Sequence, residues 1–246
     1  MLTMSGVTKR YGETVALADA HVTFDRGHVH TILGENGSGK STLVKLLSGV
    51  VRPSAGTIRL DDRPIELARP ADAQRLGIAT VFQEVLLAPA RSVLENVFMG
   101  YDGLFRYRID RAERRRRAEA ALASVTRNPL DLDRPAGTVP LAQQQLIVLA
   151  RALVREPRIL ILDEVTAALD FGDRDVLFEA IRAFVDGGRL ALFISHRMDE
   201  VRRLSDRVTV LRSGSVVETL ETGEITERRL LSLMLPDTHI PVGQHV

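Results

Sequence analysis

The sequence has 246 residues, of which 45% are hydrophobic and 26% charged, as in ordinary globular domains and unlike disordered or collagenous chains. Its 33 Lys and Arg nearly balance its 32 Asp and Glu, so a formal net charge of +1 gives no global reason to expect nucleic acid or an anionic membrane as a partner. Cysteine is absent, which excludes disulfides and thiolate metal sites.

The N-terminus lacks the charged start and continuous apolar stretch of a secretion signal, so we expect the protein to stay inside the cell. The densest apolar runs, at residues 146–150 and 159–162, are much shorter than the roughly 18 residues needed to span a bilayer. Any membrane contact is therefore expected to go through a partner.

Short β-rich runs alternate with amphipathic helical patterns along most of the chain. The pairs are residues 29–33 with 41–47, 158–162 with 174–185, and 190–194 with 198–204. This order predicts an α/β fold with a mainly parallel sheet and flanking helices. Strand-like segments at 15–24 and 57–60, separated by Gly and Pro turns, predict an antiparallel annex beside that sheet.

Between about residues 84 and 153 helix formers replace the β-branched runs, which predicts an inserted helical subdomain. Helices are expected at 92–99, with Ser92 as N-cap, and at 109–125. We interpret the four arginines at 114–117 as a solvated helix face next to Glu113 and Glu119. The chain is predicted to be one domain, residues 1–246, with its core at about 1–83 and 154–235 and a poorly ordered tail at 236–246.

The strongest local signal is a phosphate-loop motif. The pattern G-x-x-x-x-G-K-[ST] is filled by Gly34, Glu35, Asn36, Gly37, Ser38, Gly39, Lys40 and Ser41. It falls between a predicted strand and a helix that continues from Thr42, as the motif requires, and this context disfavours a chance Gly-rich turn. We expect the loop to bind ATP, with Lys40 facing the β- and γ-phosphates and the Ser41 hydroxyl facing Mg²⁺.

A second signal is the apolar run at 158–162, which ends in the adjacent carboxylates Asp163 and Glu164. A buried parallel strand delivers such residues to the sheet edge where ligands bind. We expect Asp163 to hold Mg²⁺ through its water shell and Glu164 to activate the water that attacks the γ-phosphate. Alone, such a pair could simply cap a helix or turn, so the prediction depends on its combination with the phosphate loop.

Together with Ala168, Leu169 and Asp170, these two motifs resemble the ATPases of the ABC transporter family over nearly the whole chain. The resemblance implies that Tyr11 stacks on adenine, that Gln83 contacts Mg²⁺ and the attacking water, and that His196 hydrogen-bonds the γ-phosphate. It also implies that Asp170 reaches a second cassette.

Residues 81–84, 92–100, 143–145 and 193–197 are similar to the monosaccharide importers of the ribose and galactose type. This resemblance implies a peripheral protein at the cytoplasmic face of the membrane, bound to integral-membrane permease subunits and served indirectly by an extracytoplasmic substrate-binding protein. Many of those ATPases carry two cassettes, and this chain has room for one, so we expect the second in trans.

The clearest departure from the family lies in the signature segment, which reads Leu-Ser-Gly-Gly-Gln in most members. This sequence has Val139, Pro140, Leu141, Ala142 and Gln143. By resemblance the signature completes the partner's ATP site with a serine hydroxyl and backbone N–H groups, and proline supplies neither. Two hypotheses stay open: subfamily drift with slower turnover, or an asymmetric dimer.

The leading hypothesis is thus a transport ATPase. One alternative is a soluble ABC ATPase acting on ribosomes or DNA, although no coiled-coil or basic insertion is evident and no nucleic acid is expected. The other is a regulatory cassette with weak hydrolysis, for which the altered signature is the only support. The transported substrate and the choice between homodimer and heterodimer are left open.

Overall fold

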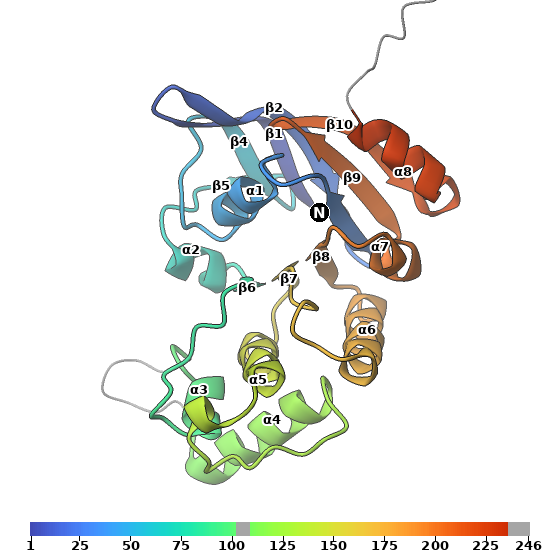
Figure 1. Cartoon of the computed structure of the whole chain (residues 1–246). Coiled ribbons are helices and arrows are strands. Elements are labelled where there is room, and N and C mark those ends of the chain that lie inside the picture. The colour runs from blue at the N-terminus through green and yellow to red at the C-terminus, as the bar shows by residue number, and fades with distance from the viewer. Residues whose placement is uncertain (102–108, 236–246) are drawn as a thin grey trace, which may run out of the picture.

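The computed structural model describes residues 1–101 and 109–235, and its ribbon is shown in Figure 1. The strands are β1 (Leu2–Tyr11), β2 (Thr14–Phe24), β3 (Val29–Leu33), β4 (Ala55–Leu60), β5 (Arg63–Ile65), β6 (Ile78–Val81), β7 (Ile159–Asp163), β8 (Leu190–Ile194), β9 (Arg207–Arg212) and β10 (Ser215–Glu221). The α-helices are α1 (Lys40–Leu47), α2 (Pro70–Arg75), α3 (Val93–Val97), α4 (Arg111–Ala123), α5 (Leu141–Leu153), α6 (Phe171–Asp186), α7 (Met198–Leu204) and α8 (Glu227–Met234).

The larger sheet has the order β10-β9-β3-β8-β7-β6 and is parallel from β9 to β6, with only β10 antiparallel. Its central strands β3, β7 and β8 are buried at every position, because helices or the second sheet cover both faces. The predicted parallel α/β core is confirmed. Its elements lie within three residues of the expected limits.

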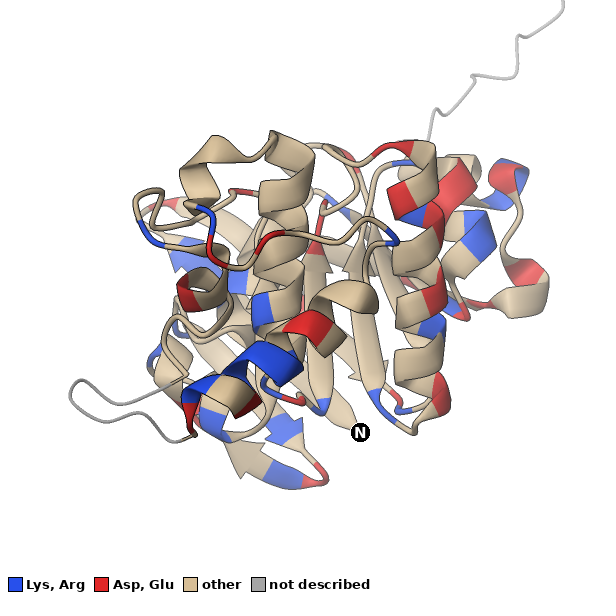
Figure 2. Ribbon diagram, turned by 90° about the horizontal axis from the view of Figure 1, so that it is seen from below, with Lys and Arg blue, Asp and Glu red and all other residues tan. Residues whose placement is uncertain are grey.

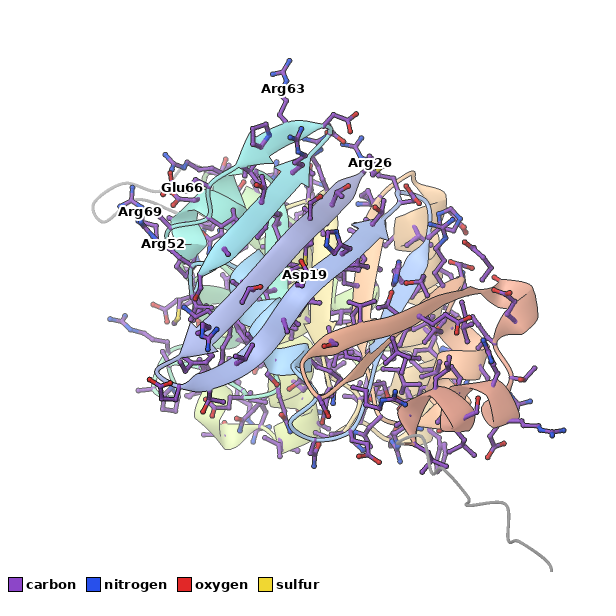
Figure 3. All side chains as sticks on the ribbon, turned by 90° about the horizontal axis from the view of Figure 1, so that it is seen from above. Asp19, Arg26, Arg52, Arg63, Glu66 and Arg69 are labelled. Atoms are coloured by element: carbon purple, nitrogen blue, oxygen red, sulfur yellow. The ribbon has the colours of Figure 1, made fainter. Side chains whose placement is uncertain are left out.

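The smaller sheet, β2-β1-β4-β5, is antiparallel throughout and confirms the predicted annex. One face packs on α1 and the larger sheet in a shared apolar cluster that includes Leu17, Leu43 and Ile161. The other face is polar, and Figure 3 shows Asp19 there, with Arg52 and Glu66 together at one edge, where they pair at 3.5 Å.

The helices α3, α4 and α5 form a group at one end of the molecule (Figure 1), between β6 and β7 in the chain. They share an apolar cluster that includes Phe98, Leu122 and Ile147. Ser92 is the N-cap of α3 as predicted: its hydroxyl accepts from the N–H of Glu95 at 3.2 Å, and the Glu95 carboxylate accepts from the N–H of Ser92 at 2.9 Å. The boundaries proposed at residues 84 and 153 stay a prediction.

The four-arginine run was only partly interpreted correctly. Seen from the helical end, acidic and basic residues are interspersed (Figure 2), and Arg116 and Arg117 pair with Glu113 at 2.8 and 2.6 Å. Arg114, however, is buried, with its guanidinium 4.5 Å from the centre of the Phe98 ring. The helix turns this one arginine toward the apolar cluster, where a flat, weakly hydrated cation can pack on an aromatic face. The prediction about the tail lies outside the described residues.

Candidate functional site

The phosphate loop joins the end of β3 to the N-terminus of α1, so its backbone N–H groups and the positive end of the helix dipole face the same space. Gly39 is the N-cap of α1 with φ +106°, a conformation that L side chains rarely adopt. A Cβ there would lie 2.8 Å from the carbonyl oxygen of Ala16. Glycine at this position therefore allows β2 to pack directly against the loop.

The β9–β10 hairpin supports the loop from the other side. The N–H of Gly214 donates to the carbonyl of Ser38 at 3.0 Å, and the Gly214 carbonyl accepts from the N–H of Ala18 at 2.7 Å. A Cβ at Gly34 would lie 2.4 Å from the carbonyl oxygen of Leu211. The strand β2 and the β9–β10 hairpin thus hold the loop in one shape.

Lys40 is 6% exposed, and its ammonium donates to the carbonyls of Gly34 and Glu35 at 2.7 and 2.9 Å. Burial lowers the pKa of Lys40, while the carboxylates of Glu164 and Asp163 act in the opposite direction. The cation is thus held over its own loop and close to two acids.

The two acids stand where β7 ends, as predicted. Asp163 closes the strand opposite Ile194 of β8, and the next N–H, of Glu164, donates to the Ile194 carbonyl at 3.1 Å. Glu164 then has φ +49°, a backbone conformation that is energetically costly for a residue with a side chain. This conformation turns the chain away from the direction of β7. Its Oε1 lies 3.3 Å from Nδ1 of His196, which follows β8.

Burial, followed by the charge of Glu164, raises the pKa of Asp163 to about 6, although Lys40 and Lys45 act in the opposite direction. A buried carboxylate beside a second acid fits a divalent cation, and an oxygen-only donor set with few protein ligands suits Mg²⁺. Asp163, Ser41 and Gln83 are the residues that could hold it.

A cavity of about 520 Å³ brings most of the predicted site together, a size typical of small-ligand sites. Its lining consists of Ala16, Asn36, Gly37, Gly39, Lys40, Ser41, Thr42, Gln83, Glu164 and His196. The cavity therefore brings together the phosphate loop, Gln83 after β6, and the residues that follow β7 and β8. Up to 180 positions separate the lining residues in the chain.

Five of the predicted residues are not in this lining. Gly34 and Asp163 are buried, and Glu35 and Ser38 line a neighbouring hollow. Tyr11 is 43% exposed at the end of β1, where it pairs with Thr14 across the hairpin. Sequence reasoning missed Ala16, because an alanine carries no chemistry that a motif could reveal and contributes only by its place on β2.

The model for the family described as ABC transporter matches residues 17–167, a span that contains the loop and both acids. The chain belongs to this family. The cassette is 40% identical over 232 residues to the ribose import ATP-binding protein RbsA 1 of Rhizobium johnstonii, covering 94% of this chain and 45% of that protein. It thus spans about half the length of the curated relatives it matches.

Solved structures agree with the family and the fold. A bacterial ABC transporter cassette solved as a dimer matches with a TM-score of 0.81 and 26% identity, covering 90% of this chain and 99% of that one. The dimeric post-hydrolysis state of that cassette, bound to ADP and Pi, matches with the same TM-score, identity and coverage. None of the helices within residues 1–101 and 109–235 has both the length and the hydropathy of a membrane span.

Proposed function

We propose that this cassette binds and hydrolyses ATP for a transporter that imports a sugar, and that it works at the cytoplasmic face of the membrane. The observation that supports this most is the single cavity lined by Lys40, Ser41, Gln83, Glu164 and His196. It combines a phosphate-binding loop, a candidate base and a second polar side chain that contacts that base.

ATP binding would begin at the loop. The Lys40 ammonium would exchange its contacts with the carbonyls of Gly34 and Glu35 for stronger, charge-assisted ones with the β- and γ-phosphates. The free N–H groups of the loop and of the first turn of α1 would donate hydrogen bonds to phosphate oxygens. Tyr11, at the turn between β1 and β2, would stack on adenine.

Mg²⁺, when bound with ATP, would offset the negative charge that develops on the phosphate oxygens. Ser41, Gln83 and Asp163 would hold it. Residues that follow β7 and β8 would act on the attacking water. Glu164 would accept its proton as general base. His196, 3.3 Å from the Glu164 carboxylate, would orient that carboxylate while hydrogen-bonding the γ-phosphate.

A second cassette would complete the site, because the signature segment of one cassette faces the ATP of the other in this family. In this chain α5 begins at Leu141 with Pro140 as its N-cap, and no side chain caps the helix. The helix end would offer its free N–H groups to the partner's γ-phosphate, but without a serine hydroxyl. Asp170, the N-cap of α6, would stand at the same dimer face.

Sugar import is favoured by the similarity to a ribose import ATP-binding protein over 94% of this chain. A permease in the membrane would receive the conformational change, and an extracytoplasmic binding protein would deliver the sugar to it. The test is affinity purification of the tagged chain from its native membranes. Co-purification of an integral-membrane permease and a second cassette supports the proposal, and recovery with ribosomes or DNA contradicts it.

The altered signature favours one alternative, a regulatory cassette that binds ATP but hydrolyses it weakly. Pro140 lacks both a hydroxyl and an N–H, so this chain would serve its partner's nucleotide poorly while its own phosphate loop stays intact. An ATPase assay on the purified dimer separates the two: turnover that sugar-loaded binding protein stimulates in the presence of the permease supports transport, and negligible turnover under all conditions supports regulation.

A further inference from the structure

Behind the candidate site lies a completely buried carboxylate, that of Glu200 in the first turn of α7 (0% exposed). Four groups from three segments approach it. They are the hydroxyls of Ser195 at 2.6 Å and Thr166 at 3.0 Å, and the guanidinium groups of Arg197 at 3.4 Å and Arg174 at 3.6 Å. A buried charge is tolerated only when such partners are held in place, so this cluster fixes the segments that contribute to it.

The segment that carries His196 is fixed on both sides of that residue. The Ser195 hydroxyl donates to Oε2 of Glu200 and accepts from the N–H of Arg197 at 3.0 Å. The Arg197 guanidinium also reaches Oε1 of Glu200. The His196 side chain is 58% exposed, and within residues 1–101 and 109–235 its only polar contact is the one with Glu164, so its position depends on its neighbours.

The segment that carries Glu164 is attached to the same carboxylate. Thr166 follows Glu164 by two residues, and its buried hydroxyl donates to Oε2 of Glu200, the oxygen that also accepts from Ser195. Glu164 needs such support, because its positive φ persists only where surrounding contacts hold it.

Arg174 of α6 supplies positive charge to the cluster. It is 8% exposed, and its guanidinium also lies 4.7 Å from the centre of the Phe171 ring. The same guanidinium lies 3.7 Å from Asp199, a carboxylate that is 72% exposed on the turn that carries Glu200. In Figure 1 α7 lies next to one end of α6, in agreement with these contacts. Asp199 therefore provides a matched control, since it shares the helix and the arginine but not the contacts with Ser195 and Thr166.

We propose that Glu200 is a positioning residue for ATP hydrolysis, which holds the turns after β7 and β8 in register so that His196 stays over Glu164. The inference rests on the proposed ATPase function. Among the described residues, Glu200 neither lines the cavity nor bonds to the phosphate loop, so its role would concern the geometry of water attack and not nucleotide affinity.

The test compares Glu200→Gln with Asp199→Asn in the full chain. The glutamine keeps the shape and one acceptor oxygen but turns an amide toward two arginines and removes the charge. We expect kcat to fall roughly 10- to 100-fold, the usual cost of losing a group that orients a reacting residue, while the Kd for ATP and the circular dichroism spectrum stay unchanged. Asp199→Asn is expected to keep the wild-type kcat.

Ser195→Ala provides the second arm and keeps the test valid if Glu200→Gln does not fold. It removes only the hydroxyl between Glu200 and the turn of His196, so kcat is expected to fall and the double variant to be no slower than the slower single one. Two results would reduce Glu200 to a stability role and overturn the inference. One is a double variant in which the losses of kcat from the two single variants add, and the other is single variants with an unchanged kcat and a lower Tm. Wild-type chain that binds but never hydrolyses ATP would overturn the proposed function and this inference with it.

Discussion

Nδ1 of His196 lies 3.3 Å from Oε1 of Glu164, although each residue belongs to a different turn and they are 32 positions apart. The contact exists because β7 and β8 are parallel neighbours whose carboxyl ends meet at one edge, with Asp163 opposite Ile194. A candidate general base and the group that orients it are thus brought together by strand order.

Lys40→Ala is expected to weaken ATP binding by two orders of magnitude or more, since it deletes the buried cation that faces the phosphates. Lys45→Ala is the control, because Lys45 is exposed on the same helix and does not line the cavity. Titration with a fluorescent ATP analogue measures both. Equal affinities for wild type and Lys40→Ala would refute the phosphate-loop assignment.

Gly39→Ala tests the packing of the loop on β2. The added Cβ would lie 2.8 Å from the Ala16 carbonyl oxygen at a φ of +106°, so we expect loss of nucleotide binding together with destabilisation. Gly188→Ala is matched in its positive φ, +74°, but its Cβ would meet nothing within 4 Å. It should cost only about 1 kcal/mol of unfolding free energy and leave ATP binding intact. If both variants bind ATP normally, the close approach of β2 is not required.

The buried His30 is expected to make the fold sensitive to acid. Burial, with a smaller effect of Arg207, lowers the pKa of His30 to about 3, whereas an unfolded chain protonates histidine near 6.5. The contribution of neutral His30 to the free energy of unfolding is therefore fully present above about pH 6.5. It falls by about 1.4 kcal/mol per pH unit as the pH drops from that value to the folded-state pKa of about 3.

Urea denaturation of wild type and His30→Gln at several pH values measures this slope. The raised pKa of Asp163 makes the folded state more stable as the pH falls below about 6, which is opposite to the trend expected from His30. Because this effect is common to both proteins, the difference between their free energies of unfolding isolates His30. Parallel stability curves for wild type and His30→Gln would contradict the prediction.

Restoring the signature should accelerate hydrolysis. Pro140→Ser with Ala142→Gly returns a hydroxyl and removes a methyl at the start of α5, and a hydrogen bond to a charged group is worth about 1.5 to 3 kcal/mol, equivalent to roughly 10- to 100-fold in rate. In a homodimer steady-state ATPase activity should rise. In a heterodimer the gain should appear only at the partner's nucleotide, and an unchanged or lower rate in both settings would remove the support for an asymmetric dimer.

The sequence predicted those parts whose pattern is local. Each parallel strand is a short buried run, so β3, β7 and β8 were recognisable, and the phosphate loop and the acid pair stood at their ends. By contrast, β1 was not anticipated: its register with β2 shifts at three places, between Met4 and Arg10, and such bulges interrupt the alternation that identifies a strand.

Residues whose role depends on tertiary contact were also missed. Glu200 reads as an ordinary acidic residue in the first turn of a helix, where it would favour the helix dipole, and nothing in the sequence marks its contacts with Thr166 and Ser195. The burial of Arg114 was missed for the same reason, since helical periodicity alone does not say which of four consecutive arginines faces Phe98.

The central claim is that this cassette hydrolyses ATP with Glu164 as the base. The most direct test measures steady-state phosphate release and ATP affinity in parallel for wild type, Glu164→Gln and the surface control Glu179→Gln, whose carboxylate is 68% exposed. We predict hydrolysis by wild type and the control, none above background by Glu164→Gln, unchanged ATP affinity in all three, and an ATP-bound dimer trapped by the Glu164 variant on size-exclusion chromatography. Near-normal phosphate release by Glu164→Gln would contradict the account.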